Sequence, residues 1–160
     1  IGRLLQMGIR AICREEAEYI AADARVTTWM ARDVMSICDG EEAWNNWLDT
    51  LRQIDGPVWL TIDVDGLDPA YVPTTGTPVP GGLAFWQVVE TIETIGESCG
   101  HNWLGADINE IVPDENNQVS EFTAAMLATK VVATHLASKL AVEETVERNQ
   151  DERNQSEEVQ

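Results

Sequence analysis

Two aspartates, Asp63 and Asp65, stand at the end of a short apolar stretch, VWLTIDV, that spans residues 58–64. An apolar, β-branched run between helical segments predicts a buried parallel strand. In a strand, side chains two positions apart lie on the same side, with their Cα atoms about 7 Å apart. Two carboxylates at one edge repel each other and are costly to desolvate, so a cation should offset them. Hard divalent ions take carboxylate oxygens, and the spacing therefore points to a metal site.

An alternative interpretation is loop capping, in which Asp65 and Asp68 accept hydrogen bonds from backbone N–H groups. A calcium-binding EF-hand loop does not fit. With Asp63 as its first position, the sixth is Asp68 where that loop needs glycine, and the twelfth is Thr74 where it needs glutamate. The segment that follows the strand, residues 65–82, is rich in Gly, Pro and Thr, and long ordered loops are more often functional than idle.

The elements that must position these aspartates alternate between strand and helix patterns. Apolar spacings of three and four predict helices, and short apolar runs predict strands. The expected strands are 4–9, 58–64 and 103–108, and the expected helices are 14–24, 30–37, 41–54, 83–97 and 121–140. Ser120 is expected to cap the last helix, and Thr27 or Thr28 the second. The alternation predicts an α/β domain with a mainly parallel sheet.

Composition excludes several classes of function. The chain has 160 residues, 28 acidic against 10 basic, and a net charge of −18. This acidity argues against nucleic acid and anionic membranes as partners, and no apolar run approaches the roughly 20 residues of a membrane span. Three cysteines without CxxC spacing favour a reduced, cytoplasmic protein with small buried thiols.

The two ends of the chain differ from the middle. The first residue is Ile, in an apolar pattern already under way, so we expect a piece of a longer chain. Residues 1–140 are interpreted as part of one domain. Residues 141–160 hold seven acidic residues and no aromatic residue, which predicts a disordered, solvated tail.

Three strings of residues together resemble the ureohydrolase family, which includes arginases and agmatinases and cleaves guanidino groups. IDVDGLDPAYVPTTGTPVPGGL resembles the family's S-x-D-x-D-x-x-D-P and G-T-P-x-x-G-G-L motifs, with Thr61 in place of the first serine. LGADINEIVP, residues 104–113, resembles G-x-D-x-x-E-x-x-P, and MGIR resembles the family's GIR segment. The resemblance spans roughly residues 4–138 and implies an arginase-like, three-layer αβα fold, incomplete because an N-terminal half is absent.

The resemblance also implies roles for individual residues. Asp63 and Asp65 match ligands of a two-metal cluster, usually of two Mn²⁺ ions, with Asp63 the bridging ligand. Metal-bound hydroxide attacks the guanidinium carbon in that family, and urea leaves. Glu110 matches the glutamate that pairs with the substrate guanidinium, and Thr77 matches a threonine on the substrate side. Neither histidine, His101 or His135, matches a family ligand, and no residue is assigned as catalytic.

The family's other ligand segments, G-x-x-H and D-A-H-x-D, do not occur in this chain. Two carboxylates leave most of an ion's coordination to water, so we expect the chain alone to bind metal weakly and to be inactive in isolation. INEIVPD is similar to agmatinases, which implies hydrolysis of agmatine to putrescine, and family members often form homo-oligomers. Arginase, guanidinobutyrase, formimidoylglutamase, a non-catalytic relative and a one-metal deacetylase of the related fold are the alternatives.

Overall fold

Strands and helices alternate along the chain in the computed structural model, which describes the backbone of residues 2–158 and, within that range, the side chains of all but 101, 144, 147, 149 and 151–158. The elements are β1 (Leu4–Ile9), α1 (Arg14–Ala22), β2 (Val26–Met30), α2 (Ala31–Val34), α3 (Gly40–Arg52), β3 (Val58–Asp63), α4 (Phe85–Cys99), β4 (Trp103–Asn109) and α5 (Val119–Glu158). Two short 3₁₀ turns, η1 (Val64–Gly66) and η2 (Gly100–Asn102), follow β3 and α4. The predicted α/β class is confirmed.

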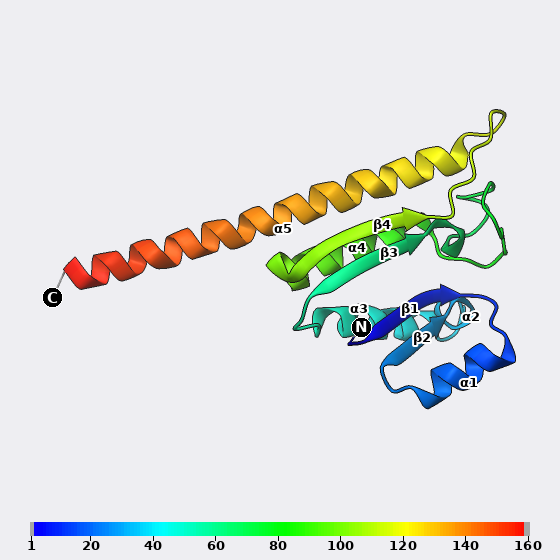
Figure 1. The fold of residues 1–160 in the computed structure, drawn as a ribbon, viewed down its shortest axis with the longest axis horizontal. Helices are drawn as coiled ribbons and strands as arrows, with labels where there is room; N and C mark the ends of the chain where they lie inside the picture. Colours follow the sequence, from blue (N-terminus) through cyan, green and yellow to red (C-terminus); the bar gives the residue numbers. More distant parts are fainter. Residues whose placement is uncertain (1, 159–160) are drawn as a thin grey trace.

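The described strands form two parallel pairs rather than one continuous sheet. β1 pairs with β2, and β3 pairs with β4 (Figure 1). In the second pair, Ile62 lies opposite Ile108 and Asp63 lies opposite Asn109. The carboxyl ends of β3 and β4 are therefore level, and the residues that follow each strand are neighbours in space.

One face of the β3–β4 pair packs on helices and the other carries polar groups. Along β3 the side chains alternate, with Ile62 buried and Trp59, Thr61 and Asp63 exposed, as the period of a strand requires. The buried side joins a core with α3 and α4. Its members with almost no exposed surface are Leu51, Val64, Leu67, Val72, Val89, Ile92, Ile95, Trp103 and Leu127.

Residues 26–30 form β2, so the expectation that Thr27 or Thr28 caps a helix is wrong. Three β-branched residues and a tryptophan, VTTW, suit a pleated strand better than a helix start. The Thr28 hydroxyl donates instead across the pair to the Gln6 side chain at 2.9 Å.

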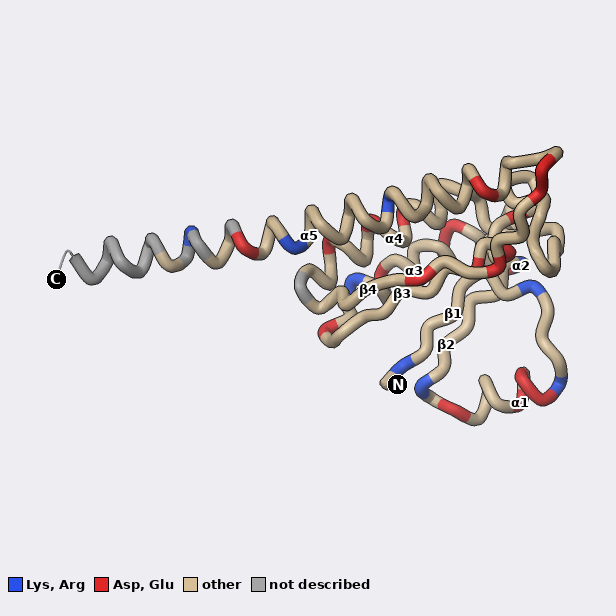
Figure 2. The backbone as a smooth tube through the Cα atoms, turned by 45° about the horizontal axis from the view of Figure 1, so that its top comes forward, with Lys and Arg blue, Asp and Glu red and all other residues tan. Residues whose placement is uncertain are grey.

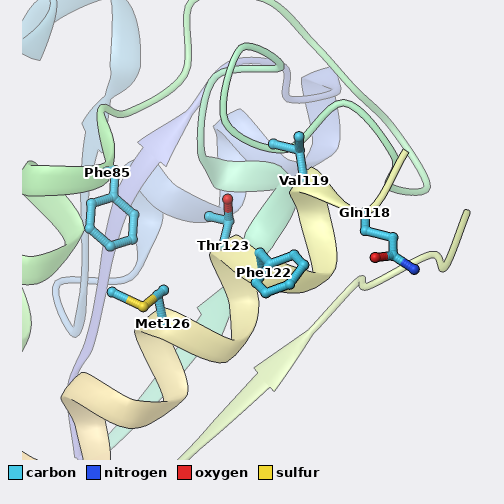
Figure 3. Close-up of a pocket in the computed structure, with 6 residues that line it drawn as sticks. All are labelled: Phe85, Gln118, Val119, Phe122, Thr123 and Met126. Carbon is cyan, nitrogen blue, oxygen red and sulfur yellow. The ribbon is translucent and has the colours of Figure 1, made fainter. Parts of the chain in front are cut away.

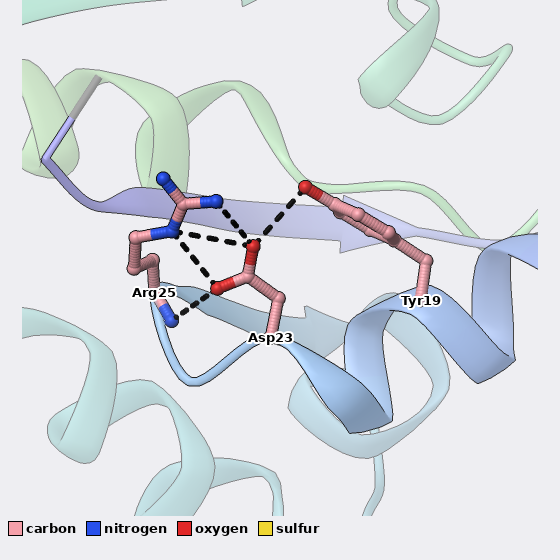
Figure 4. A network of polar contacts seen from close by, with 3 residues as sticks. All are labelled: Tyr19, Asp23 and Arg25. Atoms are coloured by element: carbon pink, nitrogen blue, oxygen red, sulfur yellow. Dashed lines mark hydrogen bonds and ion pairs between the residues drawn. The ribbon is translucent and has the colours of Figure 1, made fainter.

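An ion-paired turn brings the chain from α1 into β2 (Figure 4). The Arg25 guanidinium donates to both carboxylate oxygens of Asp23, at 2.7 to 3.2 Å, and the Tyr19 hydroxyl donates to the same carboxylate at 3.1 Å. These bonds hold the pKa of Asp23 well below its usual range, and the bonds from Arg25 contribute most.

Helix α5 continues to Glu158, whereas the sequence predicts disorder from residue 141. No glycine or proline follows Pro113, and Glu, Arg, Gln and Ala have high helix propensity, so nothing local ends the helix. Figure 1 shows its C-terminal part running beyond the other elements, and Figure 2 shows acidic and basic residues both occurring there.

The segment Val119–Glu143 of α5 is long and apolar enough to cross a membrane by length and composition, with a mean hydropathy of 1.2 over its best window. One such helix is weak evidence for a membrane span, and 11% of that window is buried inside the structure. In this structure α5 packs along α4, with Gly96 of α4 lying against Thr134 of α5, and Leu127 of α5 is fully buried.

Candidate functional site

The carboxyl ends of β3 and β4 bring three of the four predicted site residues together. Asp63 is the last residue of β3, and Glu110 follows Asn109, which pairs with Asp63. Asp63 is exposed as a whole residue, but partial burial of its carboxyl raises the pKa of that group, and the charges of Asp65, Glu110 and Asp107 raise it further. The site is therefore a cluster of like charges, which favours a cation.

Asp65 lies in the 3₁₀ turn η1, not in the strand as predicted. The chain turns after Asp63, so the rule for side chains two apart in a strand does not apply to this pair. Their charges still interact, because the charge of Asp65 raises the pKa of Asp63.

Two residues far away in the sequence hold Asp65. The Arg10 guanidinium donates to the backbone carbonyl of Asp65 and, at 2.9 Å, to that of Gly8. The Thr77 hydroxyl donates to Asp65 Oδ2 at 2.7 Å. The sequence predicts Thr77 to be on the substrate side, and the structure shows its hydroxyl engaged by Asp65.

Asp68 fixes the loop that carries Thr77. Its carboxylate accepts the backbone N–H groups of Ala70 at 3.0 Å and Gly81 at 2.8 Å, and these bonds lower its pKa. Loop capping is thus confirmed for Asp68. The Asp65 carboxylate differs, because it accepts a hydrogen bond from the side-chain hydroxyl of Thr77.

Glu110 is the one non-glycine residue with positive φ, at 63°, among residues 2–158. Such backbone costs about 1–3 kcal/mol and persists where neighbouring contacts impose it. The Thr75 hydroxyl donates to the Glu110 carbonyl at 2.7 Å, and Thr75 forms an antiparallel bridge with Ile111. Gly76 lies against the carboxylate, since a Cβ there would stand 2.8 Å from Glu110 Oε2.

Asp107 is held on the exposed face of the β3–β4 pair. Its carboxylate accepts the indole N–H of Trp59 at 2.5 Å, the Asn109 amide at 2.5 Å and the Thr61 hydroxyl at 3.3 Å. The bond from Trp59 contributes most to lowering its pKa. Asp107 therefore stays ionised and adds a fixed negative charge beside Asp63.

The carboxylate groups at this site are of the type that Mn²⁺ binds, but there are too few of them to hold an ion tightly. Carboxylate oxygens are ligands that Mn²⁺ prefers. Among the residues that the structure describes, however, no group of three or more His, Cys, Asp and Glu side chains could hold a metal ion. We therefore derive no catalytic step through a metal from these residues alone.

A shallow apolar pocket of about 460 Å³ lies elsewhere, at the start of α5 (Figure 3). It is lined by Phe85, Gln118, Val119, Phe122, Thr123 and Met126. No charged side chain lines it, so it offers nothing to balance the charge of a guanidinium. The carboxylate cluster, not this pocket, is the candidate site.

Sequence reasoning missed the residues that support the site. Arg10 lies within the MGIR string, but nothing in the string indicates which backbone groups it binds. Thr75 and Ser120 resemble ordinary turn and capping residues. His135, which matches no family ligand, packs its ring 5.0 Å from that of Trp103. The side chain of His101 lies outside the described part of the chain.

Comparison with known proteins gives a consistent result. The model of the arginase family matches residues 2–137. An N(1)-aminopropylagmatine ureohydrolase of Synechocystis sp. is 35% identical over 130 residues, which are 80% of this chain and 39% of that protein. An agmatinase of Pyrococcus horikoshii is 34% identical over 125 residues, 78% of this chain and 40% of that protein.

Solved structures agree with these relatives. The agmatine ureohydrolase of Thermoplasma volcanium superposes with a TM-score of 0.66 at 31% identity, over 84% of this chain and 42% of that one. The chain thus spans about two fifths of the length of the curated relatives it matches, at 39% and 40% for the two named here.

Proposed function

Because this chain belongs to the arginase family, we propose that the whole protein hydrolyses the guanidino group of a small linear substrate, with agmatine as that substrate. The reaction adds water across the guanidino carbon and releases urea and the amine putrescine. Relatives named agmatinase and aminopropylagmatine ureohydrolase, at 34% and 35% identity, support this choice of substrate.

The observation that carries the proposal is the carboxylate cluster of Asp63, Asp65 and Glu110 at one edge of the β3–β4 pair. Burial first, and then the like charges of its neighbours, raise the pKa of Asp63 there, so binding a cation relieves a repulsion already present. A guanidinium presents parallel N–H donors, and one carboxylate can accept two of them. Glu110 would hold the guanidinium in this way and so orient its carbon.

Asp63 and Asp65 are proposed as manganese ligands, with two ions per site in the whole protein. Bound metal would supply a hydroxide near neutral pH. Thr77 would hold the Asp65 carboxylate through Oδ2, and Arg10 would hold its backbone. The remaining ligands would come from a further part of the whole protein, and this chain alone should bind Mn²⁺ weakly and release no urea.

Metal binding tests the ligands directly. In calorimetric titration with Mn²⁺, Asp63→Asn and Asp65→Asn should each reduce the weak binding of the chain to background. Asp49→Asn, a change in an exposed aspartate of α3 that pairs with Arg52, is the matched control and should leave binding unchanged. Tight binding of two ions by the unchanged chain would contradict the incomplete site.

Urea release tests the reaction. With Mn²⁺ present, the whole protein should release urea from agmatine faster than from arginine or guanidinobutyrate, and Glu110→Gln should lower kcat/KM about 100-fold or more. Absence of urea from all three compounds would rule out the enzyme assignment.

The whole protein is also proposed to be a cytoplasmic homo-oligomer. Exposed apolar side chains on α5, Phe122, Met126 and Leu136 among them, support the assembly, since each is more than half exposed. Sedimentation of the whole protein would measure it, and a monomer at all concentrations would exclude it.

A further inference from the structure

The loop of residues 74–77 connects the two halves of the carboxylate cluster. Thr77 at one end donates to Asp65, and Thr75 donates to the backbone of Glu110. Between them, Gly76 leaves room for the Glu110 carboxylate. A single short loop thus sets where both acidic groups lie.

The same loop is anchored to the core through α5. The backbone N–H of Thr74 donates to the Ser120 hydroxyl at 2.8 Å, and the two hydroxyls are 2.6 Å apart. Ser120 is fully buried, so this anchor is shielded from water. Thr75 therefore projects from a fixed point and can impose a conformation on its partner.

That partner, Glu110, holds a backbone conformation that an isolated residue of its type avoids. Its φ of 63° is in the left-handed region, where the side chain crowds the backbone. Rotation to an ordinary negative φ would swing Cβ, and with it the carboxylate, away from its position over Gly76. The 2.7 Å bond from Thr75 Oγ1 to the Glu110 carbonyl opposes that rotation.

We propose that Thr75 is a positioning residue, whose hydroxyl holds Glu110 in its left-handed conformation and so aims the Glu110 carboxylate at the guanidinium. The role in substrate binding rests on the proposed function, whereas the role in setting φ of Glu110 does not. Thr75 itself touches no substrate. It acts through Glu110, and removing its hydroxyl should weaken guanidinium binding while the fold is kept.

The test uses NMR of the chain and three variants. Positive φ gives Glu110 a strong intraresidue NOE between its amide and α protons. Thr75→Val keeps the shape of the side chain and removes the donor, and should weaken this NOE to the ordinary intensity of a residue with negative φ. Thr75→Ser keeps the donor and should retain it. Thr28→Val removes a threonine hydroxyl bond of the β1–β2 pair and is the matched control.

The second part of the test measures agmatine binding. Binding is monitored through the changes in chemical shift of the Glu110 NMR signals. Thr75→Val should weaken agmatine binding about tenfold, and Thr75→Ser and Thr28→Val should leave it within twofold. In the whole protein, Thr75→Val should raise KM by more than it lowers kcat, because a contact that binds the guanidinium already in the ground state is weakened.

The outcomes separate the two proposals. If Glu110 keeps positive φ in Thr75→Val, or if Thr75→Ser loses it equally, the positioning role is refuted. If agmatine binds to none of the variants nor to the unchanged chain, guanidinium recognition by this chain fails, and the NMR signal of Glu110 still decides the role of Thr75.

Discussion

Gly82 provides a sharp test of how the loop is closed at the edge of the site. A Cβ at this position would lie 2.5 Å from the carbonyl oxygen of Leu67 and 2.6 Å from the backbone nitrogen of Asp68, and it would also meet the Leu67 carbonyl carbon. These are backbone atoms in a bridge with Leu83, so no side-chain rotation relieves the contact. Ordinary contact begins at 3.4 Å, so the two segments must separate by about 0.9 Å.

We expect Gly82→Ala to reduce the free energy of unfolding by about 3 kcal/mol, the upper part of the range for overpacking, because the clash is with backbone. For a chain of this size that corresponds to a fall in Tm of about 6–12 °C. Urea unfolding and thermal melts followed by circular dichroism would measure both quantities.

Gly66→Ala is the matched control, since a Cβ there meets nothing within 4 Å and its φ is not positive. It should leave the free energy of unfolding within about 1 kcal/mol, or raise it slightly by reducing the entropy of the unfolded chain. If Gly82→Ala stays within 1 kcal/mol of the unchanged protein, or if both variants lose equally, the argument from backbone contact is refuted.

Three further variants test packing, a buried polar contact and pH dependence. Leu127→Ala, in the fully buried part of α5, should cost about 3 kcal/mol in urea unfolding, and a cost below 1 would mean that α5 packs loosely. Trp47→Phe removes the 3.0 Å bond from the indole N–H to the Thr91 hydroxyl and should cost about 1–2 kcal/mol, which a double-mutant cycle with Thr91→Val should attribute to this pair. Asp68→Asn should cost about 1 kcal/mol at pH 7 by weakening its bonds to backbone N–H groups. Because the pKa of Asp68 is lowered in the folded state, that stabilisation is present above the unfolded-state pKa near 4 and is lost as pH falls through the folded pKa. Unfolding of both proteins at pH 7 and in acid should therefore converge in acid, and a constant difference would contradict the assignment.

The sequence predicts most of the helices and the position of the aspartates because those features are local. Residues 41–54 repeat apolar side chains at helical spacing, and α3 runs from Gly40 to Arg52. Residues 58–64 are apolar and β-branched, and β3 ends at Asp63. The strand β2 was not predicted. Thr27 and Thr28 precede an apolar segment and so resemble helix caps, and the sequence does not indicate that this segment pairs with β1.

The supporting contacts of the site could not be predicted, because they depend on tertiary structure. Arg10 and Asp65 are 55 residues apart, and Thr75 and Glu110 are 35 apart. Neither separation leaves a spacing signal in the chain. The positive φ of Glu110 is equally hidden, since a glutamate followed by isoleucine indicates nothing unusual about its backbone.

The contact of Arg10 with Asp65 links the β1–β2 pair to the turn that follows β3. This contact affects how the site depends on pH. Arg10 bonds to the backbone carbonyls of Gly8 and Asp65, and a backbone carbonyl does not titrate in the range in which proteins stay folded. The tether between β1 and η1 is therefore insensitive to pH. Any titration observed at this edge should reflect changes of charge on the carboxyl groups themselves, rather than movement of one strand pair relative to the other.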